Sequence, residues 1–146
     1  MLDSKSRLSI PVDIRNLLDP AEHGSCLFLV FGLNKKAWLY TEREYEHLAD
    51  EVPAGIAPGK ATQVYRQVTF ALSSRVEFDK QGRILIPDKM KKRTGLKTEV
   101  TLVGAGNHLE IWDRAEFEAF LAENEPQIAE VTEAAMPAPP PRTNQG

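Results

Sequence analysis

The chain has 146 residues and a formal net charge of −3, which allows one compact domain or two very small ones. With 42% hydrophobic and 27% charged residues, it has the composition of an ordinary soluble globular protein. No apolar run approaches roughly 18 residues and no segment resembles a signal peptide, so we expect a cytoplasmic protein with no membrane partner. The single cysteine excludes an internal disulfide framework, and three scattered histidines predict no metal site.

A nine-residue pattern occurs twice in the sequence. Residues 3–11 and residues 79–87 both fit D-x-x-x-R-φ-x-I-P, where φ is aliphatic, so the second copy follows the first at a spacing of 76. The similarity continues downstream, where residues 31–40 align with residues 103–112 at a spacing of 72. Solenoid repeats are shorter, about 20–50 residues, and need three or more copies. Two copies of a small β-rich unit therefore predict one fold with an internal two-fold axis.

The first copy is predicted to fold as strand, helix, strand, strand and helix. These elements are expected at residues 7–10, 11–18, 26–31 and 37–40 and from residue 41 onward. Cys26 opens an apolar run and is expected in the core. Thr41 and Glu44 form a capping box that starts the last helix. Tyr45 and Leu48 share one face of that helix, so we expect them in the core as well.

A connecting segment and the second copy follow. Residues 52–59 are rich in proline and glycine and predict a loop, while residues 60–72 have apolar residues at helical spacing. The second copy repeats the plan: a strand at 75–78, a tight turn at 79–82, the return strand of this hairpin at 83–86, a helix at 88–93, strands at 99–103 and 108–112, and a helix at 116–124. Phe117 and Phe120 are expected in the core. Beyond Pro126 the proline-rich composition predicts disorder.

Charge is segregated along the chain. Residues 75–97 carry eight basic and three acidic side chains, a local charge of +5, whereas residues 110–136 carry one basic and eight acidic ones, a local charge of −7. Local fields rather than the total decide whether a polyanion can dock. The basic segment is therefore a candidate binding face, and the acidic segment is expected to be a solvated flank.

The repeated turn has two interpretations that the residue types alone leave open. One is an aspartate–arginine pair across a surface hairpin, which contributes little to stability. The other is a paired basic surface with a spacing suited to a DNA groove. A two-stranded β-ribbon fits the major groove, and arginine pairs with guanine edges and phosphates. The candidate DNA-binding residues are Lys5, Arg7, Lys80 and Arg83.

The doubled motif, together with Gly95-Leu96, residues 102–104 and residues 110–113, resembles the MraZ family of AbrB/SpoVT-like swapped-hairpin DNA-binding proteins. The resemblance covers about residues 2–124. It implies an α+β fold in which two tandem AbrB/SpoVT-like β-hairpin units form an intrachain pseudo-two-fold swapped-hairpin barrel with short helices. The expected divisions are a first unit at 1–44, connecting helices and a loop at 45–72, a second unit at 73–116, and a C-terminal helix with a disordered proline-rich tail at 117–146.

The resemblance also implies a function. It predicts a sequence-specific transcriptional regulator that represses the bacterial division and cell-wall gene cluster at direct repeats in its promoter and associates with the nucleoid. The implied partners are double-stranded DNA and further copies of the chain in a ring-shaped homo-oligomer. In this family the motif arginine contacts DNA, which here maps to Arg7 and Arg83.

Alternatives from other classes are weaker. An antitoxin-like or scaffolding protein on the same fold is one, although related antitoxins usually carry a single motif and a long tail. An enzyme is another, but no catalytic triad, paired-carboxylate motif or phosphate-binding loop is recognisable. We therefore expect no enzymatic activity, no cofactor and no small-molecule substrate.

The first copy departs from the family pattern in two places. Ser6 stands where the second copy has Gly82, and serine adopts a positive φ less readily than glycine, so we expect the first turn to differ in shape. Only two residues precede Asp3, whereas a full strand precedes Asp79. The leading strand of the first copy is therefore not expected in this sequence.

Overall fold

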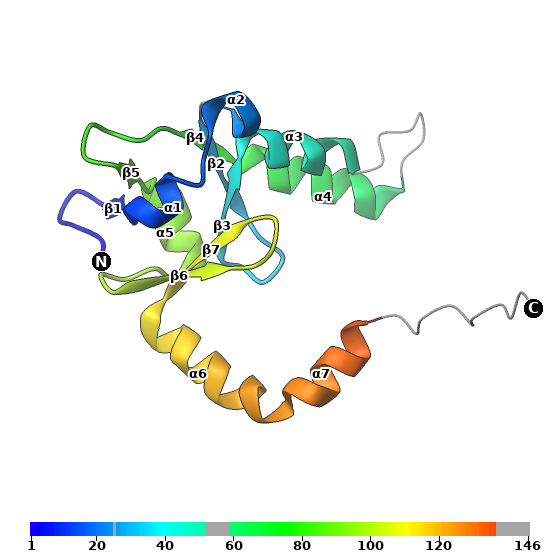
Figure 1. Ribbon diagram of the computed structural model, residues 1–146. Helices are drawn as coiled ribbons and strands as arrows, with labels where there is room; N and C mark the ends of the chain where they lie inside the picture. Colours follow the sequence, from blue (N-terminus) through cyan, green and yellow to red (C-terminus); the bar gives the residue numbers. More distant parts are fainter. Residues whose placement is uncertain (25, 52–58, 137–146) are drawn as a thin grey trace, which may run out of the picture. The chain divides into compact units, whose positions relative to one another are not determined.

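The computed structural model describes residues 1–24, 26–51 and 59–136. The chain forms two units, Met1–Arg114 and Ala115–Gly146, and each is described by itself (Figure 1). The finer division into two repeat units and a connecting segment stays a prediction. Within the described ranges, no helix is both long enough and apolar enough to cross a membrane.

The first unit contains two antiparallel sheets with short helices between the strands. Its elements are β1 (Arg7–Ser9), α1 (Val12–Arg15), α2 (Pro20–His23), β2 (Leu27–Phe31), β3 (Ala37–Thr41), α3 (Glu42–Glu51), α4 (Lys60–Ala71), β4 (Ser74–Val76), β5 (Arg83–Leu85), α5 (Asp88–Thr94), β6 (Val100–Gly104) and β7 (Leu109–Asp113). Strands β1 and β5 form a two-stranded ribbon, and the other strands form a sheet in the order β4-β2-β3-β7-β6. The predicted α+β class with antiparallel sheets is confirmed.

The expected closed barrel is not what the described strands form. Closure would require the outer strands β4 and β6 to pair with each other or with the ribbon. Among the described residues, β4 pairs with β2 and β6 pairs with β7. The ribbon and the sheet are therefore open at their edges.

The predicted hairpin between residues 75–78 and 83–86 is also wrong. The turn between them exists, but β4 pairs with β2, and β5 pairs with β1 of the other motif copy. Alternation of apolar and polar residues shows which face of a strand is buried, but it does not identify the partner strand. The sequence therefore placed these strands correctly and paired them wrongly.

Both sheets carry the internal two-fold symmetry that the repeat predicts. In the ribbon, Leu8 lies opposite Ile84, its equivalent in the second motif copy. In the sheet, Trp38 lies opposite Glu110, its equivalent at a spacing of 72. When equivalent residues face each other across antiparallel strands, a local two-fold axis passes between them. The symmetry is therefore a property of the strand pairing as well as of the sequence.

The spacing of 72 does not extend to β2 and β6. Val30 lies opposite Trp38, and Val103 lies opposite Glu110, so equivalent residues of β2 and β6 are 73 apart. The cause is the connecting loop: five residues join β2 to β3, and four join β6 to β7. The alignment at 72 is therefore one residue out of register for this strand pair.

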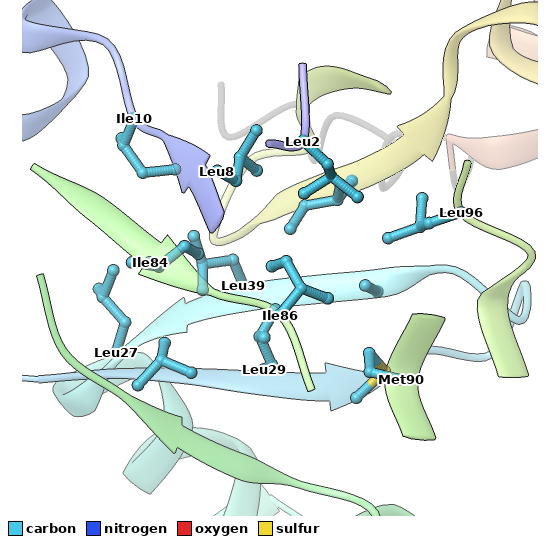
Figure 2. Packing of buried hydrophobic residues seen from close by; sticks show 13 residues of the cluster. Leu2, Leu8, Ile10, Leu27, Leu29, Leu39, Ile84, Ile86, Met90 and Leu96 are labelled. Atoms are coloured by element: carbon cyan, nitrogen blue, oxygen red, sulfur yellow. The ribbon is translucent and has the colours of Figure 1, made fainter. Parts of the chain in front are cut away.

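The hydrophobic core joins the ribbon to the sheet (Figure 2). Leu8 and Ile84 in the centre of the ribbon are buried, and Figure 2 shows them on the side where Leu29 and Leu39 of the sheet lie. The largest fully buried side chains of the described residues come from both layers: Ile10, Leu29, Ile84, Ile86 and Ile111. Burial of one such side chain contributes roughly 1.5–3 kcal/mol. The core therefore anchors the ribbon, whose opposite face stays exposed.

The helices follow the predictions with two differences: the first helix is shorter than expected, and α2 was not predicted. Helix α4 confirms the connecting helix, whereas the loop predicted before it lies almost wholly outside the described residues. The helix predicted at 11–18 is shorter. At Leu17 and Leu18 the backbone N–H groups bond to carbonyl groups three residues earlier, as in a 3-10 helix, and not four residues earlier, as in an α-helix. Pro20 follows, and a proline disfavours a helical conformation in the residue before it.

Helix α3 confirms its predicted start, but Tyr45 and Leu48, which were expected in the core, are only half-buried. The Thr41 hydroxyl accepts a hydrogen bond from the backbone N–H of Glu44 at 3.2 Å, as a capping residue does. The Tyr45 ring stacks on Phe28 at 4.0 Å and meets the edge of Phe70 on α4 at 5.9 Å. Figure 1 shows α3 and α4 side by side.

The second unit is helical throughout its described part. Helix α6 (Arg114–Asn124) begins at the boundary, and the 3-10 helix η1 (Glu125–Gln127) and α7 (Ile128–Ala135) follow. Two predictions are wrong here. Residues 128–135, predicted to be disordered, form a helix in which Ile128 and Val131 have helical spacing. Phe120, predicted to be in a core, is 44% exposed, and Phe117, predicted with it, is only half-buried. The described part of this unit contains no buried residues and so has no core of its own.

Candidate nucleic-acid interface

Both copies of the motif form the same hydrogen-bonded turn. Asp3 Oδ1 accepts hydrogen bonds from the backbone N–H groups two and four residues later, and its Oδ2 accepts one from Nε of Arg7 at 2.7 Å. Asp79 makes the same three contacts, with its Oδ2 at 2.8 Å from Nε of Arg83. Each aspartate therefore holds the backbone of its turn and the guanidinium group of its motif arginine together.

The first turn does not differ in shape, contrary to the prediction from Ser6. Ser6 has a φ of 60° and Gly82 a φ of 75°. Each donates its backbone N–H at 3.0 Å to the carbonyl of the motif aspartate. A positive φ in a residue other than glycine costs of order 1–3 kcal/mol and persists where neighbouring contacts impose it. Here the aspartate bonds impose it, and the Ser6 hydroxyl also accepts a bond from Nζ of Lys91 at 2.8 Å.

The turn contacts lower the pKa of both motif carboxyl groups. The hydrogen bond from the backbone N–H of Arg7 is the largest cause for Asp3, and the equivalent bond from Arg83 is the largest cause for Asp79. A carboxylate that accepts several N–H bonds is stabilised in its charged form. Both aspartates are therefore ionised at neutral pH, and each can orient its positively charged arginine.

The two motif arginines meet at one carboxylate. Asp3 Oδ2 lies 2.7 Å from Nε of Arg7 and 3.7 Å from Nη1 of Arg83. The side chains of Arg7 and Arg83 are 32% and 25% exposed to solvent. Arginine has five N–H donors, and the bond through Nε leaves those on the Nη nitrogens for another partner. The structure thus places two oriented guanidinium groups next to each other at the surface.

Strand alternation explains why these side chains are on the surface. Leu8 and Ile84 point into the core, so their neighbours along each strand occupy the opposite face of the ribbon. Arg7 and Arg83 lie on that outer face, one from each strand. The register places Arg7 opposite Leu85 and Arg83 opposite Ser9, so the two predicted arginines are diagonal neighbours on this face.

The predicted lysines lie in the turns and are exposed, but they are not equivalent to each other. At a spacing of 76, Lys5 corresponds to Gln81 and Lys80 corresponds to Ser4. Only the arginines recur in both copies. The symmetric part of the candidate site is therefore the arginine pair, and each lysine adds charge at one end of the ribbon.

Two basic residues in contact with the turns were not singled out from the sequence. Arg15, at the end of α1, donates from Nε to the carbonyl of Ile10 at 2.9 Å and lies against Gly82. Lys91 of α5 contacts the other turn through Ser6. The signal was present in the sequence, because Arg15 and Lys91 have the same spacing as the two motif copies. Helix α5 also exposes Lys89, Lys92 and Arg93.

A polar cluster surrounds the buried Glu110 at the two-fold axis of the sheet. Its carboxylate accepts hydrogen bonds from Asn34 at 2.8 Å and Trp112 at 2.9 Å and lies 3.0 Å from Nε2 of His108. Burial by itself would raise the pKa of Glu110, but these partners outweigh it and the pKa is lowered. The ring of His108 stacks on Trp38 at 4.1 Å. Because its polar atoms are satisfied by neighbours, this cluster stabilises the junction of β3 and β7.

Comparison with known proteins gives consistent similarities. The family model described as "MraZ protein, putative antitoxin-like" matches residues 69–137. The chain is 32% identical over 136 residues to the transcriptional regulator MraZ of Salinispora tropica, which covers 93% of this chain and 92% of the relative. It is 34% identical over 133 residues to the transcriptional regulator MraZ of Mycoplasmoides gallisepticum, covering 91% and 90%. The similarity thus extends over nearly the whole length of each protein.

Proposed function

Since the chain belongs to the MraZ family, we propose that it regulates transcription by binding DNA sequence-specifically through the exposed face of the β1–β5 ribbon. Its relatives are named transcriptional regulators, and a regulator of this kind is not an enzyme. One observation carries the DNA-binding proposal. The two motif arginines are diagonal neighbours on one face of the ribbon, and each is oriented by a carboxylate.

The shape of the ribbon suits the major groove of B-DNA, which admits a two-stranded β-ribbon. The Nη donors of Arg7 and Arg83 match the O6 and N7 acceptors of guanine, which arginine contacts in a bidentate manner. Because Asp3 and Asp79 already fix the guanidinium groups, less side-chain freedom is lost on binding. Arg7 and Arg83 are therefore assigned to base edges.

The surrounding charge suits the phosphate backbone. Lys5 and Lys80 are exposed in the two turns, and α5 exposes three further basic side chains. Lysine acts as a point charge on phosphate, which positions the protein but does not read sequence. Residues 75–97 have a local charge of +5 and residues 110–136 a local charge of −7, so a net charge of −3 does not prevent docking of this face.

The target and the assembly are part of the same proposal. The regulator represses a bacterial division and cell-wall gene cluster, binds direct repeats in that promoter, and associates with the nucleoid. It acts as a ring-shaped homo-oligomer of swapped-hairpin units. A single ribbon offers few contacts, and several ribbons on successive repeats multiply the affinity of each.

The test compares three proteins on two duplexes. One duplex comes from the DNA immediately upstream of this protein's own gene, and the other is a scrambled sequence of the same composition. Arg83→Ala is expected to lose most of the preference for the upstream duplex, since one bidentate contact supplies about 1–3 kcal/mol of discrimination. Arg43→Ala, on the exposed side of α3, removes the same charge and is expected to retain the preference. Equal affinity of the unaltered protein for both duplexes would refute sequence-specific binding.

A further inference from the structure

Each motif turn is contacted by a basic side chain that follows the other copy of the motif. Arg15 donates from Nε to the carbonyl of Ile10 at 2.9 Å, and its guanidinium group lies so close to Gly82 that a Cβ added there would overlap it. Lys91 donates from Nζ to Oγ of Ser6 at 2.8 Å. Arg15 and Lys91 occupy equivalent positions in the two motif copies, as do Ser6 and Gly82. The two contacts are therefore related by the pseudo-two-fold axis of the ribbon.

The members of each pair are matched in size. On one side the longer, planar guanidinium group packs on a residue without a side chain, Gly82. On the other side Ser6 fills that space with a hydroxyl group, which accepts a single hydrogen bond from the ammonium group of Lys91. A change of one member alone removes its contact, whereas a change of both members exchanges one kind of contact for the other.

The contacted residues are the ones that set the direction of the motif arginines. Ser6 and Gly82 have positive φ and directly precede Arg7 and Arg83. Their carbonyl groups also continue the ribbon, since Gly82 O accepts from Ile10 N at 3.1 Å and Ser6 O accepts from Ile86 N at 2.9 Å. Arg15 thus contacts both partners of the first of these bonds. A change in this contact is transmitted to the turn and to the arginine beside it.

We propose that Arg15 and Lys91 are positioning residues for DNA recognition, each holding the turn of the opposite motif copy so that Arg83 or Arg7 points toward the DNA. This inference rests on the proposed function, because it takes Arg7 and Arg83 as the residues that read bases. Arg15 acts through the Gly82 turn and does not itself contact the nucleic acid.

If Arg15 contacted a DNA phosphate directly, its variants would bind DNA differently from what a positioning role predicts. Lysine preserves a phosphate contact reasonably well, so Arg15→Lys would then change affinity little. A positioning role predicts that Arg15→Lys weakens DNA binding, because the lysine side chain is shorter and lacks the planar guanidinium group that packs on Gly82. It also predicts that the loss disappears in an Arg83→Ala background, since residues acting through one another are not additive.

The test transplants the contact of one turn into the other. Full-length protein is prepared with Gly82→Ser, with Arg15→Lys and with both changes, which reproduce the Ser6–Lys91 pair. Each single variant is expected to bind the upstream duplex about tenfold more weakly, and the double variant is expected to return to within about threefold of the unaltered protein. Arg43→Gln, on the exposed side of α3 and outside the proposed binding face, serves as a control for loss of a charge that contacts neither turn.

A second measurement is independent of DNA. The backbone N–H of Arg83 is bonded to Asp79 Oδ1 at 2.9 Å, so its hydrogen-exchange rate reports the order of the turn. Faster exchange in each single variant, with recovery in the double variant, is expected. Single variants that bind like the unaltered protein, or a double variant weaker than either single one, would overturn the positioning role.

These outcomes are distinguishable from failure of the proposed function. If the unaltered protein shows no preference for the upstream duplex, the proposed function is wrong and the positioning role in recognition is wrong with it. If the unaltered protein binds specifically and the exchange rate of Arg83 is the same in all variants, only the inference about Arg15 and Lys91 is wrong.

Discussion

The ribbon depends on its apolar face, and that dependence gives a quantitative prediction. Ile84 is 1% exposed, whereas its neighbour Leu85 on the same strand is 56% exposed. Replacing Ile84 with alanine removes three carbon atoms from the core, roughly 2.4 kcal/mol at about 0.8 kcal/mol each, and leaves a cavity that adds to the cost. We expect Ile84→Ala to lower the free energy of unfolding by about 3–4 kcal/mol. Leu85→Ala, a matched control, is expected to change it by about 0.5 kcal/mol or less.

Urea unfolding followed by circular dichroism measures both variants, at one protein concentration because self-association shifts apparent stability. The midpoint of Ile84→Ala is expected to fall with little change in the slope m, which shows a loss of stability and not of compactness. In a melting experiment the same loss corresponds to roughly 10 °C. If Ile84→Ala is no more destabilising than Leu85→Ala, the ribbon does not pack on the sheet as described, and the orientation of the arginine face is wrong too.

Further predictions concern DNA binding, pH and the C-terminal segment. Lys80→Ala is expected to weaken binding to the upstream and scrambled duplexes equally, unlike Arg83→Ala, since a phosphate contact carries no sequence information; a selective loss would place Lys80 at a base edge. Log affinity is expected to fall with log salt by roughly 0.9 per phosphate contacted, and a flat dependence would exclude electrostatic docking. Because the pKa values of the carboxyl groups in the two turns are lowered on folding, their contribution to stability is present above the ordinary value of about 3.9 and is lost as pH falls through the lowered values; melting temperatures from pH 6 to pH 3 are expected to fall less in Asp79→Asn. Removing residues 126–146 is expected to leave the melting temperature and most of the affinity unchanged, and a large loss of either would contradict a peripheral role for that segment.

The sequence predicted the positions of most elements and the symmetry, because both follow from local patterns. Helix α4 and strand β4 were placed by apolar spacing, strand β5 by the turn before it, and the two-fold relation by the repeated motif. The pairing was predicted less well. Strand β5 joins β1, which belongs to the other motif copy and lies about half the chain away, and strand periodicity carries no information about such a partner.

The candidate site was predicted in part for the same reason. Arg7 and Arg83 were identified as a pair, and the structure brings them to one carboxylate. That Asp3 would contact both arginines depends on the ribbon register, which the sequence did not specify. The contact of Arg15 with Gly82 joins elements that are distant in the chain, so only the recurrence of a basic residue at the spacing of the motif copies could have indicated it.

Fusion of the two motif copies in one chain has a consequence for DNA recognition. A symmetric homodimer presents two identical halves and therefore favours palindromic sites. The two halves of this ribbon share their arginines, but Lys5 corresponds to Gln81 in the other copy, and Ser6 corresponds to Gly82. One half can therefore diverge while the other is kept.

Such a ribbon has a direction, because its two ends differ in the position of the lysine within the turn and in the residue that contacts each turn. A protein whose binding face has a direction distinguishes a site from its inverse. Copies bound to successive sites can then all point the same way along the duplex, as the direct repeats of the proposed operator require. The near-symmetry of the fold and the asymmetry of its surface thus serve different purposes: the first places two arginines on one face of the ribbon, and the second gives the complex its orientation.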